Sequence, residues 1–100
     1  MALKAAFIFL APNAQPELHQ AVVETEAVHL ITVGVDSYRS AAEQAKKLVE
    51  GGVTAIELCG GFGHKGVAKV CEAVEGKAKV GVVRFDSHPG LDHKSGDDLF

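Results

Sequence analysis

The residues best suited to chemistry gather in one stretch, residues 53–66, which reads VTAIELCGGFGHKG. An apolar run ends there at a cysteine, and a glycine-rich turn then leads into a helical pattern. Glycines let a ligand approach the backbone, and the free N–H groups at the start of a helix attract phosphate or carboxylate. We therefore expect this turn to bind a small anionic or phosphorylated metabolite. The predicted ligand-binding residues are Glu57, Gly60, Gly61, Phe62, Gly63, His64, Lys65 and Arg84.

Nucleotide binding is an alternative for the same turn. Gly61, Gly63 and Gly66 match the G-x-G-x-x-G pattern, which here follows a predicted strand and opens a predicted helix. Asp86 stands 20 residues after Gly66, at the end of the next predicted strand, where an acidic residue binds the ribose in such sites. Only one strand follows the pattern, so the sequence favours a mononucleotide over a dinucleotide.

Catalysis by a thiol is a further alternative. Cys59 ends a predicted strand and faces the start of a predicted helix, a setting in which thiols become nucleophiles. The spacing of Cys59 and Lys65 resembles the Cys-x5-Arg phosphate loop of cysteine phosphatases. Lysine lacks the two-pronged guanidinium of that loop, and Gly66 replaces its hydroxyl residue. The candidate catalytic residues of such a small enzyme are Cys59, His64, Asp86 and His88.

Several of these side chains also suit a metal ion. The residues of this type that are expected near one edge of the sheet are Cys59, His64, Asp86, His88 and His93. None of their spacings is a recognised metal-binding pattern, so no metal residues are assigned and a Cys/His/Asp site remains an alternative. The sequence specifies no cofactor.

Two charged residues inside predicted strands, Glu57 and Arg84, need partners if they are buried. Strand alternation places Glu57 on the face of Cys59 and Arg84 on the face of Asp86. If the two strands are neighbours with level ends, Glu57 and Arg84 form an ion pair, which is the interpretation we favour. Alternatively, Arg84 contacts a bound anion or Glu57 acts as a general base.

The elements that position these residues follow from two alternating periodicities. Apolar runs predict strands at residues 3–10, 28–35, 53–59 and 79–86. Helical spacing predicts helices at residues 16–25, 38–49 and 67–74, and it places Cys71 in the core. Helices between strands imply right-handed β-α-β units. We expect a small three-layer α/β domain, flavodoxin-like, whose mostly parallel four-stranded sheet has the order 2-1-3-4.

Residues 1–86 are predicted to form a single α/β domain, and residues 87–100 a polar C-terminal tail. Leu99 and Phe100 offer anchors by which the tail packs as a lid over the site or as an arm exchanged between subunits. Few strands and a short first helix leave apolar surface uncovered. We therefore expect a homodimer or a higher homo-oligomer.

Composition excludes several classes of partner. The chain has 100 residues, 47% of them hydrophobic, and a formal net charge of −3. No basic cluster offsets this acidity, which argues against nucleic acid or an anionic membrane as the partner. The apolar run at residues 3–10 is too short to span a bilayer. Two cysteines without a secretion signal predict free thiols and a cytoplasmic protein.

Three segments, AAFIFLAP, GVTAIELCGGFGHKGVAKV and VGVVRFDSHPGLDHKSGD, together resemble a small prokaryotic family of full-length proteins of about this size. That family is described as a domain of unknown function, and the resemblance covers essentially the whole chain. It implies a cytoplasmic, stand-alone protein, and it supplies no activity, substrate or cofactor. The segment GGVTAIELCGG more loosely resembles the β/α units of phosphate-binding barrels.

Overall fold

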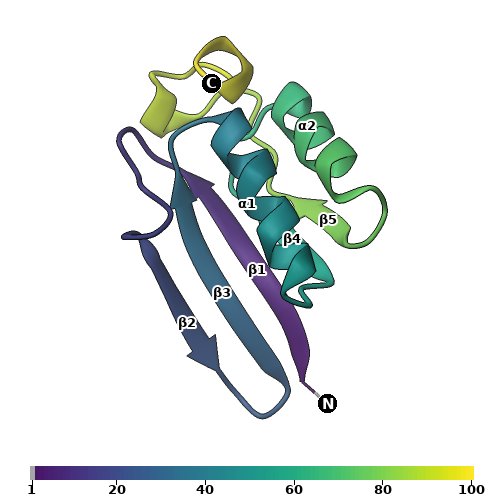
Figure 1. The fold of residues 1–100 in the computed structure, drawn as a ribbon. Coiled ribbons are helices and arrows are strands. Elements are labelled where there is room, and N and C mark those ends of the chain that lie inside the picture. Colours follow the sequence, from purple (N-terminus) through teal and green to yellow (C-terminus); the bar gives the residue numbers. More distant parts are fainter. Residues whose placement is uncertain (1) are drawn as a thin grey trace.

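The computed structural model describes residues 2–100, in which two helices cover one face of a single mixed sheet (Figure 1). The strands are β1 (Leu3–Leu10), β2 (Gln20–Glu24), β3 (Val28–Val35), β4 (Ala55–Leu58) and β5 (Lys79–Val82). The helices are α1 (Tyr38–Glu50) and α2 (His64–Val74), and two 3-10 turns follow, η1 (Pro89–Leu91) and η2 (Gly96–Asp98). Across this described part of the chain, no helix is long and apolar enough to cross a membrane.

The order of the strands across the sheet is β2-β3-β1-β4-β5. Each neighbouring pair among β3, β1, β4 and β5 is parallel, whereas β2 runs antiparallel to β3 at the edge. The α/β class and the mostly parallel sheet are therefore confirmed. Strand count and order differ from the predicted 2-1-3-4, because β2 extends the sheet beyond β3.

Residues 20–24 form a strand where the sequence predicted a helix at residues 16–25. The prediction of a helix is wrong because so short a segment gains little from helical hydrogen bonds, whereas Val22 and Val23 suit a strand paired with β3. Thr25 closes the hairpin, since its Oγ1 donates to the Val28 carbonyl and accepts the Val28 N–H, each at 2.9 Å. Both helices of residues 2–100 lie on the same face of the sheet. The domain therefore has two layers instead of the predicted three (Figure 1).

The core lies between the sheet and the two helices. In the three central strands, β1, β3 and β4, alternate residues point toward the helices and are almost completely buried. They are Ala6, Ile8, Val33, Val35, Ile56 and Leu58, which pack with Ala41, Ala45, Val70 and Val74 of the helices. The prediction that Cys71 belongs to the core is wrong. Cys71 is exposed, because residues four apart, Gly66, Val70 and Val74, form the buried stripe of α2.

The two helices approach each other closely where Tyr38 of α1 faces Gly66 of α2. Ser37 caps α1 by accepting the Ser40 N–H on its Oγ at 3.1 Å, which holds Tyr38 in the first helical turn. Tyr38 is only 4% exposed. A Cβ on Gly66 would overlap the Tyr38 ring, so the contact between the helices requires glycine.

Replacing Gly66 by alanine tests this contact. Alanine favours a helix over glycine by about 1 kcal/mol, so helical propensity alone predicts a more stable protein. We instead expect the free energy of unfolding to fall by about 1 to 3 kcal/mol, because the new Cβ overpacks a buried ring.

Urea denaturation measures this change. Gly81→Ala, in β5, is a control for adding a methyl group without overpacking, because a Cβ at Gly81 meets no atom within 4 Å beyond its chain neighbours. A Gly66→Ala protein at least as stable as the wild type would contradict the requirement for glycine.

Candidate functional site

The predicted anion-binding turn joins β4 to α2 at the edge of the sheet where the parallel strands end (Figure 1). α2 begins at His64 with Gly63 as its N-cap, and glycine has no side chain that could accept the first N–H groups of the helix. Those N–H groups carry the positive end of the helix dipole and attract a negatively charged acceptor. The acceptor must therefore come from another part of the chain or from a ligand.

Asp97, in η2, is that acceptor. Its carboxylate accepts the Lys65 N–H at 3.1 Å and the Gly66 N–H at 3.4 Å. The Tyr38 hydroxyl donates to the same carboxylate at 2.7 Å, and His64 Nδ1 lies 3.2 Å from it. Only 8% of the Asp97 side chain is exposed. The C-terminal segment thus caps α2, and two N–H groups expected to bind a ligand bind a carboxylate of the protein itself.

Tyr38 and Asp97 keep each other in complementary protonation states. Burial, and then the hydrogen bond to Asp97, raise the pKa of Tyr38 well above its ordinary value. Burial by itself raises the pKa of Asp97, yet the net effect of the site is a pKa below the ordinary value of 3.8. Hydrogen bonds from Tyr38 and from two α2 N–H groups stabilise the carboxylate, and the neighbouring His64 imidazole adds to this effect when it is protonated. At neutral pH a protonated phenol therefore donates to an ionised carboxylate.

Packing by the chain itself accounts for several glycines of the turn. A Cβ on Gly63 would overlap the Asp97 carboxylate, just as one on Gly66 would overlap Tyr38. The Phe85 ring lies so close to Gly60 that a Cβ there would overlap it as well. Two of the three glycines in the G-x-G-x-x-G match, Gly63 and Gly66, thus have a structural explanation that requires no nucleotide.

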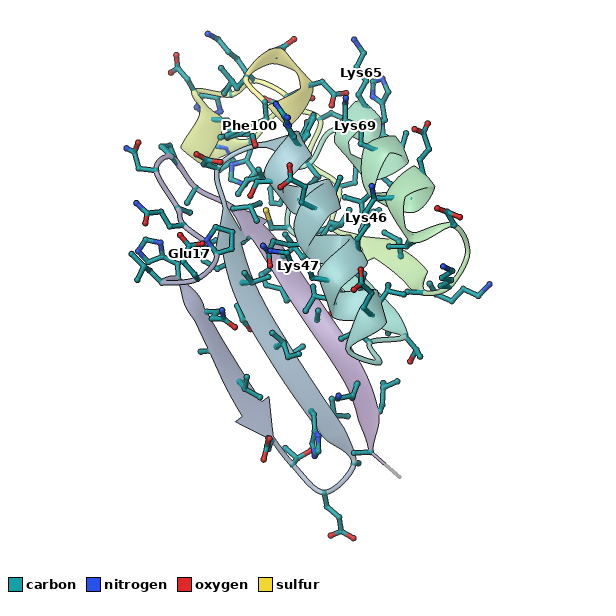
Figure 2. The ribbon with its side chains drawn as sticks, in the orientation of Figure 1. Glu17, Lys46, Lys47, Lys65, Lys69 and Phe100 are labelled. Carbon is teal, nitrogen blue, oxygen red and sulfur yellow. The ribbon has the colours of Figure 1, made fainter. Side chains whose placement is uncertain are left out.

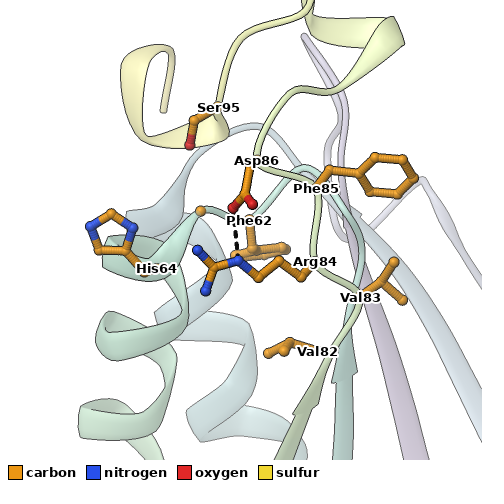
Figure 3. Close-up of a pocket in the computed structure, with 9 residues that line it drawn as sticks. Phe62, His64, Val82, Val83, Arg84, Phe85, Asp86 and Ser95 are labelled. Carbon is orange, nitrogen blue, oxygen red and sulfur yellow. Dashed lines mark hydrogen bonds and ion pairs between the residues drawn. The ribbon is translucent and has the colours of Figure 1, made fainter.

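A small hollow lies beside the capped start of α2, between that helix and the segment that continues β5 (Figure 3). Its volume is about 50 Å³, and its polar lining comes from Gly63, His64, Arg84, Asp86 and Ser95. Arg84 Nε donates to Asp86 Oδ1 at 2.7 Å, while the end of the guanidinium points toward His64 (Figure 3). The Arg84 side chain is 71% exposed, so its two outer nitrogens can donate to a bound anion.

Glu57 and Arg84 do not meet, and the predicted ion pair between them is wrong. In the observed register Glu57 is opposite Gly81, so the odd-numbered residues of β5 share the face of Glu57. Arg84 lies on the other face and pairs with Asp86. A change of one residue in register moves every side chain to the opposite face, and the sequence did not specify the register.

The remaining catalytic candidates are not brought together. Cys59 is half-buried, and its Sγ accepts the N–H groups of Leu10 and Gly61, each at 3.3 Å. His88 lies against Phe85, with 4.5 Å between the ring centroids. Within residues 2–100 no hydrogen bond joins Cys59 to a histidine or an aspartate. The same residues contain no group of three His, Cys, Asp or Glu side chains that could hold a metal ion.

Two residues of the predicted ligand-binding set have structural contacts. Phe62 is buried, and its ring stacks on Tyr38 with 5.7 Å between centroids. Lys65 is exposed at the start of α2 (Figure 2), and its backbone N–H makes the contact with Asp97.

Sequence reasoning missed three residues of the site, Tyr38, Ser95 and Asp97. A tyrosine within an apolar helical stripe usually requires a partner for its hydroxyl, and this was the available signal. The sequence does not say which aspartate of the tail is the partner, because that choice depends on how residues 87–100 fold.

The fold and the site together define a class of protein, a two-layer α/β domain whose second helix is capped by its own C-terminal segment. The chain belongs to the family of unknown function DUF6506, whose family model matches residues 3–98. This confirms the resemblance to an uncharacterised full-length family. No curated protein and no solved structure shows significant similarity to the chain. Membership assigns no activity, so the function has to be inferred from the site.

Replacing Asp97 by alanine tests the capping of α2. The substitution leaves the Tyr38 hydroxyl and two N–H groups without their acceptor in a largely buried site. We expect the free energy of unfolding at neutral pH to fall by about 2 to 4 kcal/mol, as measured by urea denaturation. Asp98→Ala is the matched control, because the neighbouring Asp98 is exposed. Equal effects of the two substitutions would show that Asp97 does not cap the helix.

The lowered pKa of Asp97 predicts a dependence of stability on pH. Because the pKa is lower in the folded state, the stabilisation is present above the unfolded value near 3.8 and is lost as the pH falls through the folded value. The free energy of unfolding should thus decrease between about pH 5 and pH 2. The free energy of unfolding of the Asp97→Asn protein should decrease less over that range. Chemical denaturation at each pH measures this free energy for both proteins. Parallel pH profiles would argue against an ionised Asp97 in the folded protein.

Proposed function

We propose that the protein binds a small anionic or phosphorylated metabolite in the hollow between α2 and the end of β5. The charged group of the ligand would lie between Arg84 and His64, with the rest of the molecule extending toward solvent. The observation that carries this proposal is the Arg84 guanidinium, which Asp86 orients toward a hollow at the positive end of a helix (Figure 3).

The donors that line this hollow support an anion as the ligand. The outer nitrogens of Arg84 form a planar pair of donors that matches two oxygens of a carboxylate or phosphate. The backbone N–H of His64, at the first position of α2, has no acceptor among residues 2–100. Ser95 adds a hydroxyl on the opposite wall. Asp97 already accepts the N–H groups of Lys65 and Gly66. The ligand would therefore contact the donors of Arg84, His64 and Ser95 without displacing the C-terminal segment.

The size of the hollow supports a small ligand. A volume of about 50 Å³ accommodates one charged group and little more. Phe62 and Val82 form an apolar wall beside it, and Val82 is 50% exposed, so adjoining carbon atoms of a metabolite could pack there. These features favour a short phosphorylated or carboxylated compound over a nucleotide, whose base would have no matching cavity in this hollow.

Composition supports the same choice of partner. The net charge of −3 disfavours binding to nucleic acid. Cys59 and Cys71 carry free thiols, which supports a reducing compartment, and we propose the cytoplasm.

Thermal denaturation with a panel of ligands tests this function. The panel contains inorganic phosphate, sugar phosphates, nucleoside monophosphates and short dicarboxylates. A ligand at 100 times its Kd stabilises the folded state by about 2.7 kcal/mol, which raises the Tm by several degrees. Arg84→Gln should abolish this rise, because it removes the charge and the paired donors while keeping most of the side-chain length.

Arg39→Gln is the matched control for that variant. Arg39 is an exposed arginine of α1 that pairs with Glu43 at 3.5 Å, away from the hollow, so its loss should leave the ligand-induced shift unchanged. The proposal fails if no member of the panel stabilises the wild type at millimolar concentration. It also fails if Arg84→Gln keeps the full shift.

A further inference from the structure

We infer that the sheet face left open by the helices is the interface of a homodimer, in which a second copy of the chain packs its own open face against it. This inference is independent of the proposed ligand, because the hollow beside Arg84 lies on the helix side of the sheet.

The open face is mostly apolar over β2, β3 and β1 and again beyond the end of β5. The register of β1 with β3 and of β2 with β3 places Phe7, Phe9, Leu30 and Val23 on the face that points away from the helices. Leu3 of the same face is 46% exposed and Val23 is 59% exposed. Beyond β5, Val83 and Phe85 point away from the helix-side residues Val82 and Arg84 (Figure 3), and they are 48% and 39% exposed. Water therefore contacts large apolar side chains from one edge of the sheet to the other.

Such a face is unusual for a sheet of this type. Parallel strands occur almost only in sheets that are covered on both faces, and four of the five strands here are joined by parallel pairing. α1 and α2 cover one face, and no helix of residues 2–100 covers the other (Figure 1). The uncovered face thus lacks the second layer that its side chains require.

The area of the face is large enough for a specific dimer of modest size. Strands of 8 residues are about 26 Å long, and five strands spaced about 4.8 Å apart give a face of roughly 500 Å² once the shorter strands are allowed for. Two copies would remove roughly 1,000 Å² or more from water, which is at the lower limit for specific interfaces.

The charges favour a second copy as the occupant. Within the strands, Glu57 and Lys79 are the two charged residues of the open face, one of each sign. In a two-fold dimer Glu57 of one protomer can pair with Lys79 of its partner, and symmetry repeats that pair. The helix layer differs, since it is rich in charged side chains of both signs, among them Lys46 and Lys69 (Figure 2) beside Glu43 and Glu72. An apolar face whose charges cancel is complementary to itself.

The shape of the face is consistent with this occupant. A hollow of about 250 Å³ opens on it beside Phe9, with Leu18, Ala21 and Thr32 in its lining. An exposed apolar side chain of the second copy, such as Val83, could enter it. The face therefore offers both a recess and projecting side chains, as an isologous interface requires.

Sedimentation velocity over a range of protein concentrations tests the dimer. We expect the wild type to sediment with twice the mass of the chain, and Val23→Lys to raise the dimer Kd by roughly tenfold or more. Val22→Lys is the matched control: Val22 is the next residue of β2, is 53% exposed, and points to the helix side. Both substitutions are at exposed positions, and circular dichroism verifies that each variant is folded.

A charge exchange tests the pairing across the interface. Glu57→Lys alone should weaken the dimer, because it places like charges opposite each other, and adding Lys79→Glu should restore it. A wild type that is monomeric at high micromolar concentration would overturn the inference. Equal effects of Val22→Lys and Val23→Lys would also overturn it, as would a double charge exchange that fails to recover dimerisation.

Discussion

The hydrogen bond from Tyr38 to Asp97 is the interaction on which the site depends. It is 2.7 Å long and joins the first turn of α1 to η2 across 59 residues of sequence. The same carboxylate caps α2, whose own N-cap is a glycine without a capping side chain. One buried carboxylate therefore connects the starts of both helices with the C-terminal segment, and loss of any member leaves the others with unsatisfied polar groups.

This network also determines which donors remain for a ligand. A glycine-rich turn before a helix normally presents its N–H groups to an anion. Here Asp97 accepts the N–H groups of Lys65 and Gly66, and Tyr38 accepts that of Gly63. The proposed ligand therefore contacts outer groups, Arg84 and His64. Gly63 and Gly66 are needed for close packing of Asp97 and Tyr38, so these two glycines serve the fold whether or not a ligand binds.

The hairpin at the edge of the sheet has the largest consequence for the overall architecture. If residues 16–25 were a helix, it could cover the second face of the sheet. Instead β2 pairs with β3 and adds a fifth strand, so the apolar side chains of the second face stay exposed. A local choice between helix and strand thus decides whether the sheet is buried within one chain or has a face that suits a second copy.

The sequence by itself determined the α/β class, most strands and both observed helices, because periodicity and caps are local properties. It also predicted the turn from β4 to α2 as a candidate site. Only the tertiary structure decided the register that separates Glu57 from Arg84, the burial of Asp97 beside Tyr38 and the exposure of Cys71. Each of these depends on contacts between residues far apart in the chain, and a shift of one residue in a strand or of one position around a helix reverses the outcome.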